Sequence, residues 1–201
     1  MAIAQWLYVD PTSGSGNKTV NVSSASPHTG RSARNTMLTV TAPGCESKTV
    51  QVNQAGKPAH VTNDSDTATA VKEGQNVTIS GKSNVAALTF SLGTGNIPIT
   101  LPTTYTAAGV TTNNGAAISG DPGATAEYAW SIVIAVPANT GTTTLTKQII
   151  ISDGQGNQDV CTITQAAGEA YLRVDKTALE LDWEGNVETF NVESNTTWTI
   201  S

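Results

Sequence analysis

The sequence predicts an all-β protein of tandem immunoglobulin-like β-sandwich domains, one complete and one split between the chain termini. Short apolar runs alternate with period two between turn residues, and none has a helical period, so no helix is expected. Charged residues make up 13% of the 201 residues, against a usual figure of about 25%. Thr, Ser, Asn, Gly and β-branched residues abound instead, which is typical of a folded β protein. The third observation is an internal repeat.

A shift of 111 positions places parts of both ends of the chain on its middle. The matched dipeptides include Asp10-Pro11 on Asp121-Pro122, Gln54-Ala55 on Gln165-Ala166, Glu73-Gly74 on Glu184-Gly185, and Ser83-Asn84 on Ser194-Asn195. Residues 1–57 therefore copy the second half of a unit that is complete at residues 58–168, and residues 169–201 copy its first half.

Read in the order 169–201 and then 1–57, the two ends rebuild a second unit. It lacks only the counterpart of Gly93–Thr111, which is expected to be a loop or hairpin. We expect the two halves to meet in space, because neither can bury enough apolar surface alone. They meet either within one chain or between neighbouring chains, and the short joint at Lys57-Pro58 favours neighbouring chains.

Each part has its own expected strands. In residues 1–57 they lie at Trp6–Val9, Lys18–Ser24, Thr36–Thr41 and Thr49–Gln54. In residues 58–168 they lie at Val77–Ile79, Leu88–Leu92, Ile97–Leu101, Trp130–Val136, Ile149–Ile151 and Val160–Ile163. In residues 169–201 they lie at Leu172–Val174, Leu179–Leu181, Phe190–Val192 and Trp198–Ser201.

The rebuilt unit carries a recognisable pattern of residues. In order these are Ser194, Asn195 and Trp198, then Trp6, Leu7, Val9 and Pro11, then Ser13–Asn17, Gly30, Arg34, Lys48–Val52 and Gln54. The pattern resembles the BACON family, Bacteroidetes-associated domains that are often N-terminal and thought to bind carbohydrate. The complete unit is a divergent copy, because Ala87 stands near the position of Trp198, Ala117 at that of Trp6 and Leu145 at that of Arg34.

The resemblance implies an immunoglobulin-like sandwich and two settings. These are secreted glycan-degrading proteins of Bacteroidetes, and virion proteins of phages that infect those bacteria. No secretory signal or apolar span precedes the first strand. We therefore expect synthesis in the host cytoplasm and a place on the virion surface, with an extracellular location as the alternative.

The composition excludes some classes of binding partner. The net charge of −6 and the pI near 4.7 leave no basic stripe, which argues against nucleic acid and anionic membrane as partners. Cys45 and Cys161 are not equivalent under the repeat, and two lone thiols fit them better than a disulfide.

Few residues suggest chemistry. His28 and His60 have no second ligand at metal spacing, so no zinc site is expected. Asp153, Asn157 and Asp159, and likewise Asn63, Asp64 and Asp66, could hold calcium, but turns are the favoured interpretation. No nucleophile, phosphate loop or carboxylate pair is visible, so we expect no enzyme, metal or cofactor.

Two classes of function remain. The first is an assembly protein, such as a phage capsid decoration, auxiliary or head-fibre protein, which pairs with itself and with other virion proteins. The predicted assembly seam and shared core comprise Trp6, Leu7, Val9, Phe190, Val192, Trp198 and Ile200. The second is a glycan-binding module using Trp6, Trp183 and Trp198 as stacking faces, although a Trp in a small sandwich is more often core. A bacterial filament or adhesin subunit is a further alternative.

Overall fold

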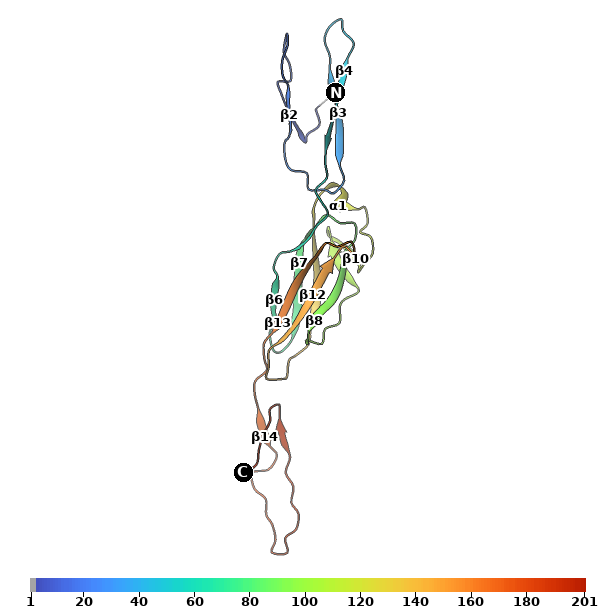
Figure 1. The fold of residues 1–201 in the computed structure, drawn as a ribbon. Helices are drawn as coiled ribbons and strands as arrows, with labels where there is room; N and C mark the ends of the chain where they lie inside the picture. The colour runs from blue at the N-terminus through green and yellow to red at the C-terminus, as the bar shows by residue number, and fades with distance from the viewer. Residues whose placement is uncertain (1–2) are drawn as a thin grey trace.

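The computed structural model describes residues 3–201 as an elongated molecule with a compact middle (Figure 1). A sandwich-like central unit (58–168) lies between an N-terminal arm (3–57) and a C-terminal arm (169–201), which point to opposite ends. The strands of the N-terminal arm are β1 (Leu7–Asp10), β2 (Asn21–Ser24), β3 (Arg34–Val40) and β4 (Lys48–Gln54). Those of the C-terminal arm are β14 (Leu172–Val174) and β15 (Val192–Ser194).

Two sheets form the central unit. Its elements are β5 (Val61–Asn63), β6 (Thr67–Ala70), β7 (Gln75–Ser83), β8 (Thr89–Gly95), β9 (Thr104–Ala107), β10 (Val110–Asn113), helix α1 (Pro122–Thr125), β11 (Tyr128–Val136), β12 (Leu145–Ser152) and β13 (Gln158–Gln165). One sheet has the order β10-β9-β11-β7-β5 and the other β6-β13-β12-β8. The structure is therefore all-β with a sandwich-like arrangement, apart from one short helical turn.

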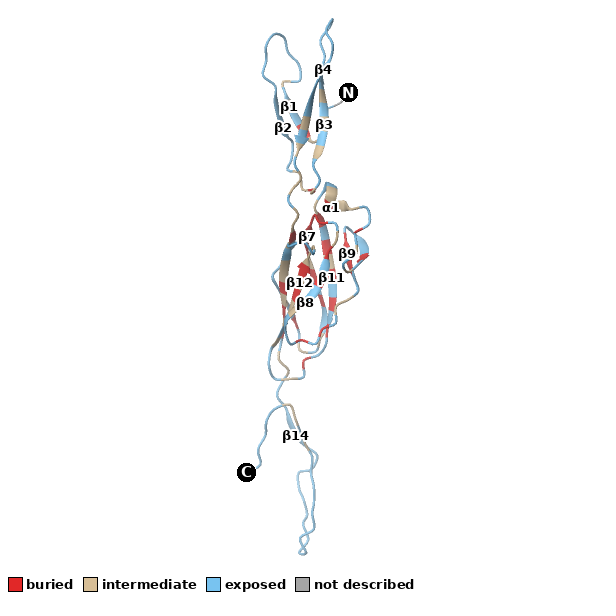
Figure 2. Ribbon diagram, turned by 45° about the vertical axis from the view of Figure 1, so that its right-hand side comes forward, coloured by how far each residue is buried: buried red, intermediate tan, exposed pale blue. Residues whose placement is uncertain are grey.

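The hydrophobic core lies between these two sheets (Figure 2). It follows directly from the alternation along the strands: β11 buries Trp130, Ile132 and Ile134 and points the residues between them outward. Phe90 packs edge-on against Trp130 with 5.5 Å between ring centroids. Apart from Leu7, the buried apolar side chains of residues 3–201 all belong to the central unit.

The arms consist of two-stranded hairpins that join no larger sheet. β1 pairs with β2, β3 with β4, and β14 with β15, and each pair forms a sheet of its own. Most apolar side chains of the arms are consequently exposed or half-buried (Figure 2). Two-stranded hairpins are marginal in water unless another layer covers their apolar face.

The internal repeat is present in the strand pairing, residue for residue. In the central unit Leu145 pairs with Gln165 and Ile151 with Asp159; 111 positions earlier, Arg34 pairs with Gln54 and Val40 with Lys48. The C-terminal arm matches in the same way, since Val61↔Ser83 recurs as Leu172↔Ser194. Each arm therefore already has the strand register of the corresponding half of the central unit.

Three predicted strands are absent, and each prediction is wrong for a physical reason. Ile97 and Ile99 are buried, but the segment 97–101 is irregular because Pro98 and Pro102 cannot donate ladder hydrogen bonds. Leu179–Leu181 and Trp198–Ser201 form no strand either. Their counterparts β6 and β8 owe their ladders to β13 and β12, strands of the other half of the unit, and the C-terminal arm contains no such partners.

Two further expectations need correction. Helix α1 was not expected; it is a single turn with Pro122 at its start, where a missing N–H costs nothing. Within one chain the two arms do not meet, because they leave the central unit at opposite ends (Figure 1). The described residues contain no helix of the length and apolarity needed to cross a bilayer.

Candidate binding surfaces on the two terminal arms

The N-terminal arm contains an open groove between its two hairpins. The groove has a volume of about 180 Å³ and is lined by Trp6, Leu7, Val22, Ser23, Ser24, Val52, Asn53 and Gln54. The Arg34 guanidinium lies 4.6 Å from the centre of the Trp6 ring and donates from Nε to Gln54 Oε1 at 2.8 Å. The Gln54 amide thus fixes the guanidinium, and the guanidinium makes a cation–π contact with the Trp6 ring at one rim of the groove.

The C-terminal arm carries the opposite half of the predicted seam, and it is open to solvent. Phe190 is 39% exposed, Trp198 47% and Ile200 73%, whereas Val192 is half-buried. On the N-terminal arm Leu7 is buried, and Val9 is half-buried. The structure therefore places the seven predicted seam residues on two separate surfaces at the two ends of the molecule (Figure 1).

The three tryptophans considered as a sugar platform do not come together in one chain. Trp6 lies on the N-terminal arm, and Trp183 and Trp198 lie on the C-terminal arm at the other end. Trp183 is 93% exposed in the turn after Asp182. The Asp182 carboxylate accepts the backbone N–H groups of Glu184 and Asn186, and Gly185 supplies the positive φ of 80° that this turn requires. A rigid turn thus presents a fully accessible indole.

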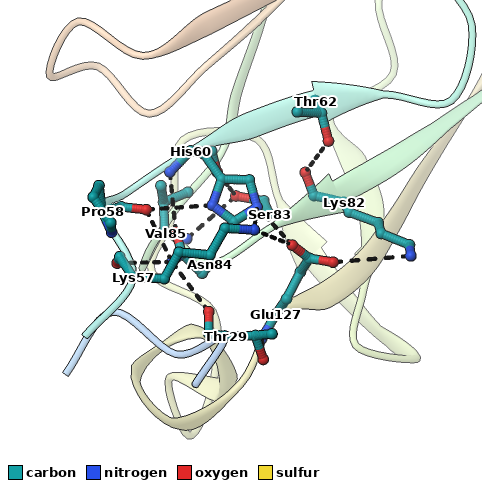
Figure 3. Close-up of polar contacts among 10 residues, drawn as sticks. All are labelled: Thr29, Lys57, Pro58, His60, Thr62, Lys82, Ser83, Asn84, Val85 and Glu127. Carbon is teal, nitrogen blue, oxygen red and sulfur yellow. Dashed lines mark hydrogen bonds and ion pairs between the residues drawn. The ribbon is translucent and has the colours of Figure 1, made fainter. Parts of the chain in front are cut away.

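The joint between the N-terminal arm and the central unit is organised by a buried amide (Figure 3). Asn84 Oδ1 accepts the His60 backbone N–H at 3.0 Å, and its Nδ2 donates to three carbonyls, those of Thr29, Lys57 and Pro58, at 3.2–3.3 Å. The amide therefore uses both its donors and its acceptor on the backbone of the joint. The arm is fastened by hydrogen bonds and not by a flexible linker.

A charged cluster lies beside Asn84 (Figure 3). The Glu127 carboxylate accepts from Lys57 Nζ at 2.9 Å and contacts His60 Nε2 at 2.7 Å. The Lys57 hydrogen bond is the main reason that the pKa of Glu127 lies below its ordinary value, and His60 adds to the effect. Arg31 pairs in bidentate fashion with Asp121 across the same joint, which raises the pKa of the guanidinium.

The central hydrogen bonds of this joint recur where the central unit meets the C-terminal arm. Asn195 donates to the carbonyls of Thr140 and Glu169, each at 2.9 Å, as Asn84 donates to those of Thr29 and Pro58. Tyr171 N–H donates to Asn195 Oδ1 as His60 N–H does to Asn84. Every partner is shifted by 111 positions. The repeat in the sequence matches Ser83-Asn84 with Ser194-Asn195, but it does not reveal that these amides form the joints.

The residues considered for metal binding lie in turns or bends, except for Asn63 in β5 and Asp159 in β13. Asp153 accepts the backbone N–H groups of Gln155 and Asn157 in the turn between β12 and β13, as the favoured interpretation predicted. Asp64 accepts from the Ser80 hydroxyl beside β5. Among the described residues no three His, Cys, Asp or Glu side chains converge in a way that could hold a metal ion. Cys45 is exposed in a turn and Cys161 is buried in β13, both as free thiols.

Comparison with known proteins identifies one part of the chain. Residues 2–55 match the family model BACON, described as "Putative binding domain, N-terminal". The N-terminal segment is thus a BACON domain segment, and the resemblance seen in the sequence is confirmed for residues 2–55. No curated protein matches the chain.

Several solved structures are similar to the chain at low identity. Two are endo-fucoidan hydrolases of glycoside hydrolase family 107, MfFcnA9 (12% identity, TM-score 0.31, 83% of this chain and 27% of that one) and the H294Q variant of MfFcnA4 (14%, 0.32, 83% and 22%). Another is an NMR structure of a protein from Bacteroides thetaiotaomicron (12%, 0.28, 65% and 97%). The chain therefore spans about a quarter of the length of the hydrolases that it matches.

Proposed function

We propose that this chain is a non-catalytic carbohydrate-binding protein. The observation that carries the proposal is the match of residues 2–55 to a family described as a binding domain. An open groove lined by apolar, hydroxyl and amide side chains fits this role better than a catalytic one, because its lining contains no titratable residue.

Trp183 is the side chain best placed to contact a sugar. Its indole is almost fully exposed on a turn fixed by Asp182, so that a pyranose ring could stack on it without displacing any neighbour. Trp6 is less suitable, because Arg34 already covers its ring.

A glycan array probed with the 201-residue chain tests this function. We expect binding to a subset of polysaccharides that is about fivefold weaker in Trp183→Ala, since an aromatic stack contributes about 1 kcal/mol. Val187→Ala is the matched control, because Val187 is 87% exposed on the same arm but has no ring. An array without any binding would contradict the proposed function. Equal binding by the Trp183→Ala variant would contradict the role of Trp183 as the sugar contact.

A structural subunit is the second candidate, and a specific observation favours it. The two arms expose apolar surfaces at opposite ends of the molecule, which is what a subunit that joins others at both ends requires (Figure 1). Such a subunit would be a capsid decoration, auxiliary or head-fibre protein on a virion surface. The alternative is a bacterial filament or adhesin subunit. Antibodies against the chain, applied to purified phage particles and to host cells, distinguish these settings by what they label.

A further inference from the structure

We propose that residues 171–201 of one chain complete residues 3–57 of a second copy, so that copies join head to tail through a shared sandwich. The occupant of the N-terminal groove is thus the C-terminal arm of another copy. The proposal gives the second candidate function its mechanism and does not depend on glycan binding.

The groove has the lining of an opened core. Under the repeat, Leu7 corresponds to Ile118, Val52 to Ile163 and Gln54 to Gln165. These three counterparts are at most 3% exposed in the central unit, where residues of the first half cover them. In the N-terminal arm Leu7 is still buried, but Val52 and Gln54 are only half-buried and all three line the open groove, because no first-half segment packs over them in the described residues.

The C-terminal arm supplies that covering half. Phe190 corresponds to the core residue Ile79. With one residue fewer after Asn195, the sequence Trp198-Thr199-Ile200-Ser201 aligns with Leu88-Thr89-Phe90-Ser91. Leu88 and Phe90 are 0% and 3% exposed, so Trp198 and Ile200 hold the positions of core side chains although they are open to solvent in a single chain.

The missing strand of the C-terminal arm has a defined partner. In the central unit β6 runs parallel to β13, with Thr67 opposite Thr162 and Ala70 opposite Gln165. The same register places residues 178–181 of one copy beside Gln51–Gln54 of the other. Leu179 would then lie opposite Val52, and each segment would gain the ladder hydrogen bonds that it lacks.

The joints give the assembly its direction. Both ends of the central unit are fastened by the same asparagine hydrogen bonds, and the arms point to opposite ends (Figure 1). A copy added at one end therefore presents the same free arm again. Such a head-to-tail contact continues as a fibre when its rotation does not close a ring.

A disulfide in the predicted register tests the exchange. Gln51 and Ala178, both exposed, correspond to the paired residues Thr162 and Thr67, and neighbouring strands lie within disulfide reach. Two variants, C45S/Q51C and C45S/A178C, are mixed under mild oxidation. Cys161 stays in place, because burial raises the pKa of its thiol and makes it inert.

We expect a covalent heterodimer in this mixture, and none when C45S/K48C replaces C45S/Q51C, since Lys48 is exposed on the same strand but out of register. The triple variant C45S/Q51C/A178C should give a ladder of multimers on a non-reducing gel. Absence of the heterodimer, equal yield with K48C, or closure within single chains of the triple variant would each overturn the proposal. Since no sugar is present, failure of glycan binding cannot cause any of these results.

Discussion

Trp198→Ala is the substitution whose effect on self-association follows most directly from the structure. Trp198 is 47% exposed in a single chain, and its counterpart Leu88 is fully buried. Covering the rest of an indole of roughly 250 Å² buries on the order of 120 Å². At about 25 cal/mol per Å² this contributes about 3 kcal/mol, or about a hundredfold in the dissociation constant. Light scattering over a hundredfold dilution series, combined with sedimentation velocity, measures this constant.

Val187→Ala provides the control for this measurement. Val187 is 87% exposed, more than Trp198, but its counterpart Asn76 is exposed on the outward face of β7. We therefore expect association of the Val187→Ala variant to stay within about twofold of the parent, because little apolar area is removed from water at this position. If both substitutions weaken association equally, nonspecific hydrophobic contacts of the C-terminal arm explain the association, and the proposed register between the two arms is wrong. A parent chain that is monomeric at every concentration refutes the exchange itself.

Three further predictions concern the central unit and its joint. Asn84→Ala should lower the free energy of unfolding in urea by about 3 kcal/mol, since it leaves buried backbone groups unpaired, whereas Asn195→Ala, in a more open joint, should cost less. The depressed pKa of Glu127 contributes stability that is present above the ordinary value of about 4.3 and is lost as the pH falls through the depressed value. In Glu127→Gln the urea midpoint should therefore depend less on pH between about pH 5 and pH 3 than it does in the parent. Glu46→Gln, at a 91% exposed side chain, should leave this pH dependence unchanged. Gly81→Ala should destabilise the central unit by about 1–3 kcal/mol in the same assay, because the new Cβ meets the Thr62 carbonyl and the Trp130 indole; a Gly81→Ala variant as stable as the parent would contradict this packing.

Most of the β architecture could be predicted from the sequence, because strands such as β7 and β11 alternate cleanly and turn residues separate the strands. Prediction failed for two reasons. Leu179–Leu181 and Trp198–Ser201 have the alternation of a strand but no ladder partner, whereas Ile97–Leu101 has the alternation but its backbone is interrupted by proline. The sequence pattern records which side chains prefer burial, whereas hydrogen-bond partners are decided by the tertiary arrangement.

The candidate surfaces could likewise be predicted only in part from the sequence. The repeat predicted that Trp6 and Trp198 belong to the two halves of one unit, and the structure adds that these halves lie at opposite ends of one chain. The sequence placed the first joint at Lys57-Pro58 but did not reveal which side chain holds it. Asn84 carries no signal as a single residue in an Asn-rich chain, and only its hydrogen bonds to Thr29 and Pro58 show what it does. The recurrence of Ser-Asn at a fixed shift was the signal that could have found it.

The two joints share their backbone contacts but differ in their side chains, and this difference sets the mechanics of the proposed fibre. Arg31 bridges to Asp121 at the first joint, whereas the corresponding position at the second is Thr142, which cannot form an ion pair. The Arg31–Asp121 pair is partly exposed, so it contributes at most about 1 kcal/mol. The asparagine hydrogen bonds must therefore hold both joints, and the ion pair stiffens only every second one. The β9–β10 hairpin likewise occurs only in the complete unit, because the rebuilt unit lacks the counterpart of Gly93–Thr111. A fibre of such copies would thus repeat every two sandwiches and not every one, with firm and softer joints in alternation.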